Sequence, residues 1–173
     1  MRLVNPLAIP GYLNLKLDQD FMMDSKSVGA GGTSSVYRGT LINPHLVDKY
    51  GFQSCVLKMF KGIDNFSTSD TTSNSIMNDK TPFYYEIAIM NILGMHPNIV
   101  QFLGYCEAPA LIVMKMYERD LKSALRNSNF ETSPLVCLKI AVDVARGMDY
   151  IHKHGVLHLD LKPRKSRNIR NVR

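Results

Sequence analysis

Three groups of residues have types and spacings that could do chemistry, and the first is the glycine-rich run GAGGTSSV at 29–36. Glycine permits a positive φ and lets the backbone approach a ligand without a Cβ in the way. An ordinary hairpin is the simpler interpretation of such a run. However, residues 36–42, VYRGTLI, read as a strand, so the glycines lie between two strands. That placement favours a hairpin flap over phosphates, whereas a dinucleotide-binding turn would open a helix.

The second group centres on Lys58, which interrupts the apolar strand CVLKMF at 55–60. Burying an ammonium group is costly unless an anion pairs with it. Glu86, on the next predicted helix and among apolar neighbours, could be that partner. An outward-facing lysine on an edge strand fits the pattern equally well, so both interpretations stay open at this point.

The third group is VLHLDLKP at 156–163, in which His158, Asp160 and Lys162 alternate with apolar residues directly after an apolar helix. Alternation of this kind is typical of a half-exposed strand, which is the simpler interpretation.

The elements that must position these residues fall into two halves. Alternation predicts strands at 12–17, 21–28, 36–42 and 55–60, with a loop at Asn43-Pro44, and these strands indicate a twisted antiparallel sheet. Ser, Thr, Asn and Asp make up fourteen of the 18 residues at 64–81, which predicts a flexible loop. Thr81-Pro82 then provides a cap and a first position for a helix over 83–93.

The second half is predicted to contain strands at 98–106 and 110–117, a short helix at 120–127 and a long helix at 134–153. The long helix carries an apolar stripe that we expect to face a core. Its members are Leu138, Ala141, Val142, Ala145, Met148 and Ile151.

Composition is that of a soluble globular protein, with 45% hydrophobic and 21% charged residues in a chain of 173. The net charge of +6 arises in residues 162–173, which contain six basic and no acidic side chains. We therefore expect at most salt-sensitive, nonspecific affinity for nucleic acid, confined to that tail. No run approaches the roughly 20 apolar residues of a membrane span. Three widely spaced cysteines favour reduced thiols and a cytoplasmic location.

Taken together, the order and spacing of these motifs resemble those of eukaryotic protein kinases of the Ser/Thr or tyrosine-kinase-like type, from about residue 21 to 163. By this resemblance the glycine-rich loop covers the ATP phosphates, Lys58 contacts them and Glu86 pairs with Lys58. Asp160 takes the position of the catalytic base, with Lys162 beside it. The ATP-binding residues implied are Gly29, Ala30, Gly31, Gly32, Val36, Val56, Lys58, Met114, Lys115 and Met116, with Met114 as gatekeeper and the last two in the hinge that meets adenine.

The resemblance implies an α+β fold: a kinase-like N-lobe, with an antiparallel sheet and one helix, followed by the first helices of an incomplete C-lobe. The expected divisions are an N-terminal extension at 1–20, the N-lobe and hinge at 21–117 with its insert at about 64–81, a partial C-lobe at 118–163 and a basic tail at 164–173. The implied reaction transfers the ATP γ-phosphoryl group to a protein Ser/Thr or Tyr hydroxyl. The expected partners are ATP and either a protein substrate or a kinase.

Several positions depart from the family pattern. Ser34 replaces the third glycine, and Leu159 replaces the arginine that usually precedes the catalytic aspartate. Lys165 stands five residues after Asp160, where the family has a metal-binding asparagine, and a lysine would repel Mg²⁺. The Asp-Phe-Gly segment is also missing, so Mg²⁺ is expected for the family but no metal ligand is assigned. We therefore predict a kinase-like chain that is inactive alone; the alternative is a non-catalytic nucleotide- or partner-binding module, a truncated regulator or decoy.

Removing residues 165–167 would join the flanking residues into HLDLKPRNI and restore the asparagine spacing. This suggests a shifted reading frame, a retained intron or an insertion near residue 164. A genuine basic C-terminus is the other interpretation.

Overall fold

The computed structural model describes residues 9–63 and 80–165 of the chain. The described residues divide into two compact units. One comprises residues 9–63, 80–92 and 102–116, and the other comprises residues 93–101 and 117–165. Each unit is treated separately below.

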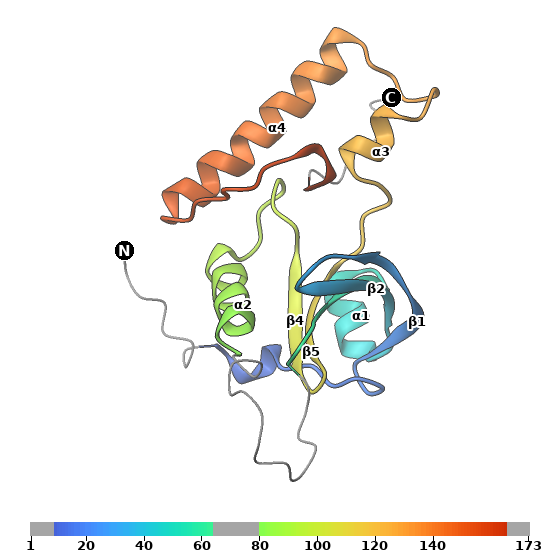
Figure 1. Cartoon of the computed structure of the whole chain (residues 1–173), viewed down its shortest axis with the longest axis vertical. Coiled ribbons are helices and arrows are strands. Elements are labelled where there is room, and N and C mark those ends of the chain that lie inside the picture. The colour runs from blue at the N-terminus through green and yellow to red at the C-terminus, as the bar shows by residue number, and fades with distance from the viewer. Residues whose placement is uncertain (1–8, 64–79, 166–173) are drawn as a thin grey trace. The chain divides into compact units, whose positions relative to one another are not determined.

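The first unit is built on a five-stranded sheet in the order β1-β2-β3-β5-β4, with antiparallel pairing throughout (Figure 1). This arrangement confirms the predicted antiparallel sheet and the α+β class. The strands are β1 (Phe21–Ala30), β2 (Ser34–Leu41), β3 (Ser54–Phe60), β4 (Phe102–Glu107) and β5 (Ala110–Lys115).

Apolar residues form two clusters in this unit. One cluster contains Cys55 and Leu57 of β3 with Leu41 and Val113, all fully buried. The other joins the helix α2 (Thr81–Leu93) to the sheet through its buried members Leu13, Ile63, Phe83, Ile87, Tyr105, Ala110 and Ile112. The sheet is therefore apolar on both faces, and helix α2 is held by its aromatic and branched side chains.

The segment predicted as a strand at 12–17 is instead a short 3-10 helix, η2 (Gly11–Leu13), followed by extended chain with two isolated bridges, from Asn14 to Tyr105 and from Leu17 to Phe21. The predicted alternation is nevertheless present, because Leu13 and Leu15 are buried while the residues between and beside them are exposed. Isolated bridges do not make a strand, so the predicted strand is absent, although the predicted buried positions are correct.

Residues after Asn43 were predicted as a loop, but they form the helix α1 (Pro44–Tyr50). Asn43 caps it: its Oδ1 accepts from the His45 N–H at 3.0 Å, and Pro44 takes the first helical position. Gly51 ends the helix with a left-handed φ of 71°. The same kind of capping signal predicted α2, so α1 could also have been predicted from the sequence.

The second unit contains α3 (Leu121–Leu125), α4 (Pro134–Lys153) and the 3-10 turn η3 (Pro163–Lys165). The bounds of α4 match the predicted helix, and its predicted apolar stripe is covered only in part, at Ile151. Val136, Gly147 and Ile151 are buried, whereas Leu138 and Val142 are 61% and 38% exposed. The reason is that α4 packs through Val136 and Ile140 against Ala124 and Phe130, which lie on another side of the helix.

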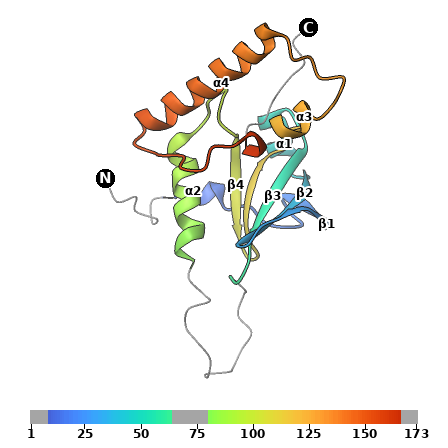
Figure 2. The same cartoon turned by 45° about the horizontal axis from the view of Figure 1, so that its top comes forward.

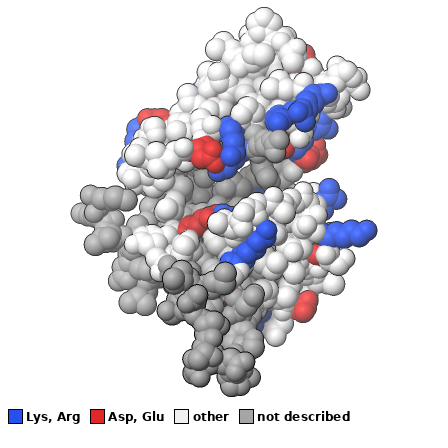
Figure 3. All heavy atoms as spheres, viewed as in Figure 1, with Lys and Arg blue, Asp and Glu red and all other residues white. Residues whose placement is uncertain are grey.

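Residues 98–101, predicted as part of a strand, precede β4, and a turn there has Ile99 N–H donating to the His96 carbonyl. The predicted flexible loop falls mainly on residues 64–79, which lie outside the described residues. In the described parts of the chain, no helix has the length and apolar character needed to span a membrane. On the face drawn in Figure 3, acidic side chains lie among the basic ones.

Candidate functional site

The glycine-rich run forms the connection between β1 and β2. Gly29 pairs with Val36 and Ala30 with Ser35, and the turn closes through a 2.8 Å hydrogen bond from the Gly31 N–H to the Ser34 carbonyl. The hairpin flap expected from the sequence is thus the geometry observed here.

Lys61, just beyond β3, holds the tip of this flap. Its N–H donates to the Thr33 carbonyl at 3.0 Å, and its Nζ donates to the Gly31 carbonyl at 2.7 Å. The sequence gave no signal for this contact, because a lysine after a strand is ordinarily a solvated surface residue.

Of the two properties of glycine considered for the flap, a positive φ and an open backbone, only the second is found. Positive φ values occur at Gly51, Gly62, Gly94 and Gly155, but not at Gly29, Gly31 or Gly32. A Cβ built on Gly32 would meet nothing within 4 Å. The turn therefore does not need left-handed glycines, and what they provide is an open backbone that a ligand can approach.

Lys58 and Glu86 form an ion pair within the first unit. The Lys58 Nζ donates to both carboxylate oxygens of Glu86, at 2.7 Å to Oε1 and 2.5 Å to Oε2. The two side chains are 26% and 34% exposed, so the pair is half-buried and open to solvent on one side. Of the two interpretations left open for Lys58, the structure has the paired one.

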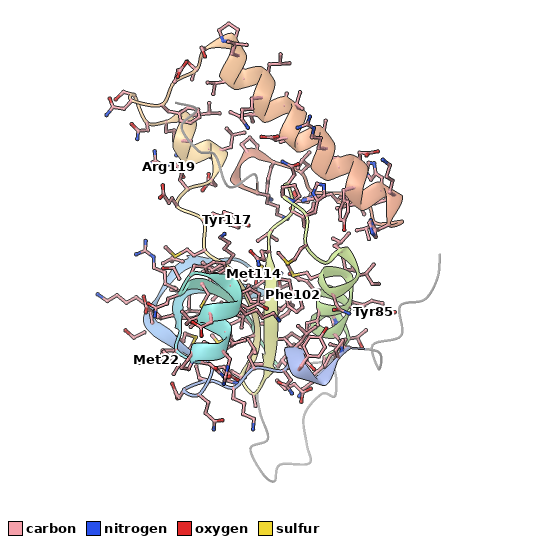
Figure 4. The ribbon with its side chains drawn as sticks, turned by 180° about the vertical axis from the view of Figure 1, so that it is seen from behind. Met22, Tyr85, Phe102, Met114, Tyr117 and Arg119 are labelled. Atoms are coloured by element: carbon pink, nitrogen blue, oxygen red, sulfur yellow. The ribbon has the colours of Figure 1, made fainter. Side chains whose placement is uncertain are left out.

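Strand register places other predicted ATP-binding residues on the same face of the sheet as Lys58. Residues directly opposite one another in an antiparallel ladder share a face. Val36 lies opposite Lys58, and Val56, two residues before Lys58, lies opposite Met114. Figure 4 shows Met114 near Phe102, its partner on β4. An ammonium group is thus bordered by apolar side chains on one sheet face.

The two predicted hinge residues, Lys115 and Met116, are held by different contacts. Lys115 pairs with Cys55, so its side chain belongs to the opposite sheet face, where its Nζ lies 4.5 Å from the Phe52 ring centroid. The Met116 N–H donates to the Ser54 carbonyl at 3.3 Å. Any contact of Lys115 with a ligand on the Lys58 face would therefore come from its backbone.

In the second unit, α4 is joined to the 93–98 turn. The Tyr150 hydroxyl donates to the Leu93 carbonyl at 2.6 Å, and the Tyr150 ring stacks on His96 with centroids 4.1 Å apart. A Cβ on Gly147 would come within 2.9 Å of the Asn98 carbonyl oxygen. Glycine at 147 therefore permits the close approach of α4 to the turn that contains His96 and Asn98.

Asp160 lies in the loop after α4 with two lysines on one carboxylate oxygen. Its Oδ2 is 2.8 Å from the Lys165 Nζ and 3.0 Å from the Lys162 Nζ. The turn η3 brings Lys165 back, since its N–H donates to the Lys162 carbonyl at 2.8 Å. The hydrogen bond from Lys165, followed in size of effect by the one from Lys162, lowers the pKa of the Asp160 carboxyl to about 2.

Leu159, directly before Asp160, combines two costly features. Its φ is 54°, in the left-handed region that side chains with a Cβ rarely adopt, and it is 90% exposed. The position at which the family has an arginine is thus occupied by an apolar side chain in solvent.

Comparison with known proteins agrees with this geometry. Residues 22–169 match the family described as protein tyrosine and serine/threonine kinase. The chain is 31% identical over 164 residues to the probable serine/threonine-protein kinase pats1 of Dictyostelium discoideum, which covers 92% of this chain and 5% of that protein. It is 30% identical over 139 residues to the serine/threonine-protein kinase SKS1 of Saccharomyces cerevisiae, covering 78% of this chain and 27% of that protein.

The Arabidopsis thaliana integrin-linked protein kinase 1 is 27% identical over 170 residues, covering 95% of this chain and 30% of that protein. The chain therefore spans less than a third of the length of each of these relatives. The chain belongs to the protein kinase family.

The predicted site residues fall into two groups by position. The flap glycines, Val36, Val56, Lys58, Glu86 and Met114 lie in the first unit, and Asp160 and Lys162 lie in the second. The contact of Lys165 with Asp160 was not foreseen, because its spacing suggested only that it would repel a cation. Since lysine and aspartate attract, their closeness could have been inferred from charge alone.

Proposed function

We propose that the chain binds ATP through its first unit, using the flap at 29–34, Lys58 and the apolar side chains around it. The observation that carries this proposal is the half-buried Lys58–Glu86 pair on the same sheet face as Val36, Val56 and Met114. An ammonium fixed by a carboxylate but open to solvent on one side can receive a phosphate oxygen. Apolar neighbours provide a surface for a purine ring.

Each residue would have a distinct part in the family reaction, transfer of the γ-phosphoryl group to a protein hydroxyl. Lys58 would contact the phosphates, Glu86 would orient Lys58, and the backbone of the flap would cover the phosphates. Asp160 would accept the proton of the substrate hydroxyl, with Lys162 beside it. The kinase relatives named above support Ser/Thr hydroxyls as acceptors.

The residues around Asp160 do not fit a divalent cation. Two ammonium groups contact its Oδ2, and Lys165, one of them, occupies the position of the metal-binding asparagine. Residues 9–63 and 80–165 contain no group of three His, Cys, Asp or Glu side chains that could hold a metal ion. We therefore assign no step to Mg²⁺ and expect little phosphoryl transfer from this chain alone.

Equilibrium binding of ATP to the full chain tests the proposal. We expect measurable affinity, and Lys58→Met should weaken it about tenfold or more, because a hydrogen bond between charged groups is worth about 1.5–3 kcal/mol. Lys26→Met, which removes an exposed lysine of β1, is the control and should leave the affinity unchanged. Affinity equal in all three proteins, or none in the parent chain, would refute ATP binding at this site.

A second candidate function, a binding module without turnover, is favoured by the contact of Lys165 with Asp160. It predicts that ATP binds equally well with Mg²⁺ and with a chelator. It also predicts that transfer of labelled phosphate to a generic protein substrate is no greater for the parent chain than for Asp160→Asn. Transfer that exceeds the Asp160→Asn background would instead make this chain an active kinase.

A further inference from the structure

We propose that residues 10–17, which precede the matched kinase region, act as a strap that positions α2 and therefore Glu86. This inference rests on the proposed function only where it concerns ATP affinity. The strap consists of η2 and the extended residues after it, and it lies beside α2 and β4 in both views (Figures 1 and 2).

The backbone of the strap is fixed to β4. The Leu15 N–H donates to the Tyr105 carbonyl at 2.6 Å, and Asn14 forms a bridge with the same residue. Gly104 makes the contact possible, because a Cβ there would lie 2.6 Å from the Leu13 carbonyl oxygen and 2.7 Å from the Leu15 Cγ. The strap is thus seated in a site that glycine leaves open.

Two leucines of the strap divide its packing between the two clusters. Leu13, 8% exposed, belongs to the cluster with Phe83 and Ile87 of α2. Leu15, 4% exposed, belongs to the other cluster, whose buried members include none from α2. Phe83 precedes Glu86 by three residues and Ile87 follows it, so Leu13 supports the turn of α2 that carries Glu86.

Asp20 fixes the far end of the strap. Its Oδ2 accepts from the Lys16 N–H at 2.8 Å, and its Oδ1 accepts from the Asn43 side-chain amide at 2.6 Å. Its carbonyl also accepts from the Ile42 N–H at 2.9 Å. The strap is therefore held at Leu15 and at Lys16, the residues that follow Leu13 and keep it beside the α2 cluster.

The test compares two leucine truncations in the full chain by hydrogen exchange. Leu13→Ala should accelerate exchange of the α2 amides about tenfold relative to those of β3, because the cavity opens in the cluster that contains Phe83 and Ile87 of α2 and no buried residue of β3. Leu15→Ala is the matched control: it removes the same atoms from the same strap and should not accelerate α2 selectively. If the alanine variant does not fold, Leu13→Val should show a smaller selective effect in the same direction.

Equal effects of Leu13→Ala and Leu15→Ala on α2, or no effect of either, would overturn the positioning role. ATP affinity gives the second readout, and we expect Leu13→Ala to weaken it about fivefold. Failure of the parent chain to bind ATP would refute the proposed function while leaving the exchange result valid. Selective loosening of α2 with unchanged ATP affinity would show that the strap does not act through Glu86.

Discussion

At the scale of single residues, the environment of Asp160 has the greatest chemical consequence. A carboxylate that takes up a substrate proton works best with a pKa near the working pH. Lys165 and Lys162 move the pKa of Asp160 the other way, to about 2. If Asp160 has the proposed role, we therefore expect the lysine at position 165 to disfavour proton acceptance.

Titration of Asp160 provides a residue-scale prediction. Because its pKa in the folded chain is lowered, the two lysine contacts are complete above the ordinary value of 3.8 and are lost only as the pH falls toward about 2. The carboxyl carbon resonance should therefore stay that of a carboxylate from neutral pH down to about pH 3. Lys165→Asn should raise the midpoint toward 3.8, with Lys162 keeping it somewhat lower.

Lys153→Met is a suitable control for this titration, since Lys153 pairs with Asp149 on α4 and not with Asp160. It should leave the midpoint of Asp160 unchanged. A parent chain in which Asp160 already titrates near its ordinary value would show that the lysine contacts do not persist in solution.

The candidate site was predictable from sequence only where residue type restricts the possibilities. The pairing of Lys58 with Glu86 could be proposed from the sequence because a lysine in an apolar strand needs an anion. Lys61 could not be placed on the Gly31 carbonyl, because the hydrogen bond depends on where the flap turns back toward the end of β3. Contacts that depend on where the folded chain turns back cannot be predicted from the spacing of residues in the sequence.

At the scale of elements, α4 shows how an apolar stripe can mislead. Its residue range was predicted correctly, but Leu138 and Val142 of the stripe are exposed while Ile151 is buried, and the buried residues include a glycine. Hydrophobicity patterns assign a glycine to no face, although here Gly147 sets the approach of α4 to Asn98. Helix α1 is the opposite case: its capping residues are recognisable in the sequence, yet the helix was not predicted.

Gly147→Ala is the element-scale prediction. Helix propensity alone would favour alanine by about 1 kcal/mol. The new Cβ would lie 2.9 Å from the Asn98 carbonyl oxygen, however, and such overpacking costs about 1–3 kcal/mol. We expect a net loss of stability of up to about 2 kcal/mol by urea denaturation. A gain of about 1 kcal/mol would mean that α4 does not approach the turn so closely.

At the scale of the whole molecule, the two units differ in how much core they contain. Among the described residues, the first unit has two clusters that include many fully buried side chains, whereas the second has one cluster of Ala124, Phe130 and Val136. Several leucines of the second unit are largely exposed, including Leu135, Leu138, Leu157 and Leu159. Burial of apolar surface is the main favourable term in folding, so the units should differ in stability.

Hydrogen exchange across the full chain should reveal this difference. We expect α4 amides to exchange at least about tenfold faster than those of β3 and β5, a difference of about 1.4 kcal/mol in opening free energy. Adding ATP should slow exchange in the first unit if the proposed site is correct. Equal protection of α4 and the sheet would instead indicate a single cooperative unit.

The seating of the strap on Gly104 has a consequence for how related sequences can vary. A side chain at that position would collide with the Leu13 carbonyl and the Leu15 side chain, so neither partner can change freely while the other stays. Across relatives, a glycine at this point of β4 and a paired leucine motif before the first strand should be gained and lost together. Relatives with a larger residue there would have to support the Glu86 helix by other means.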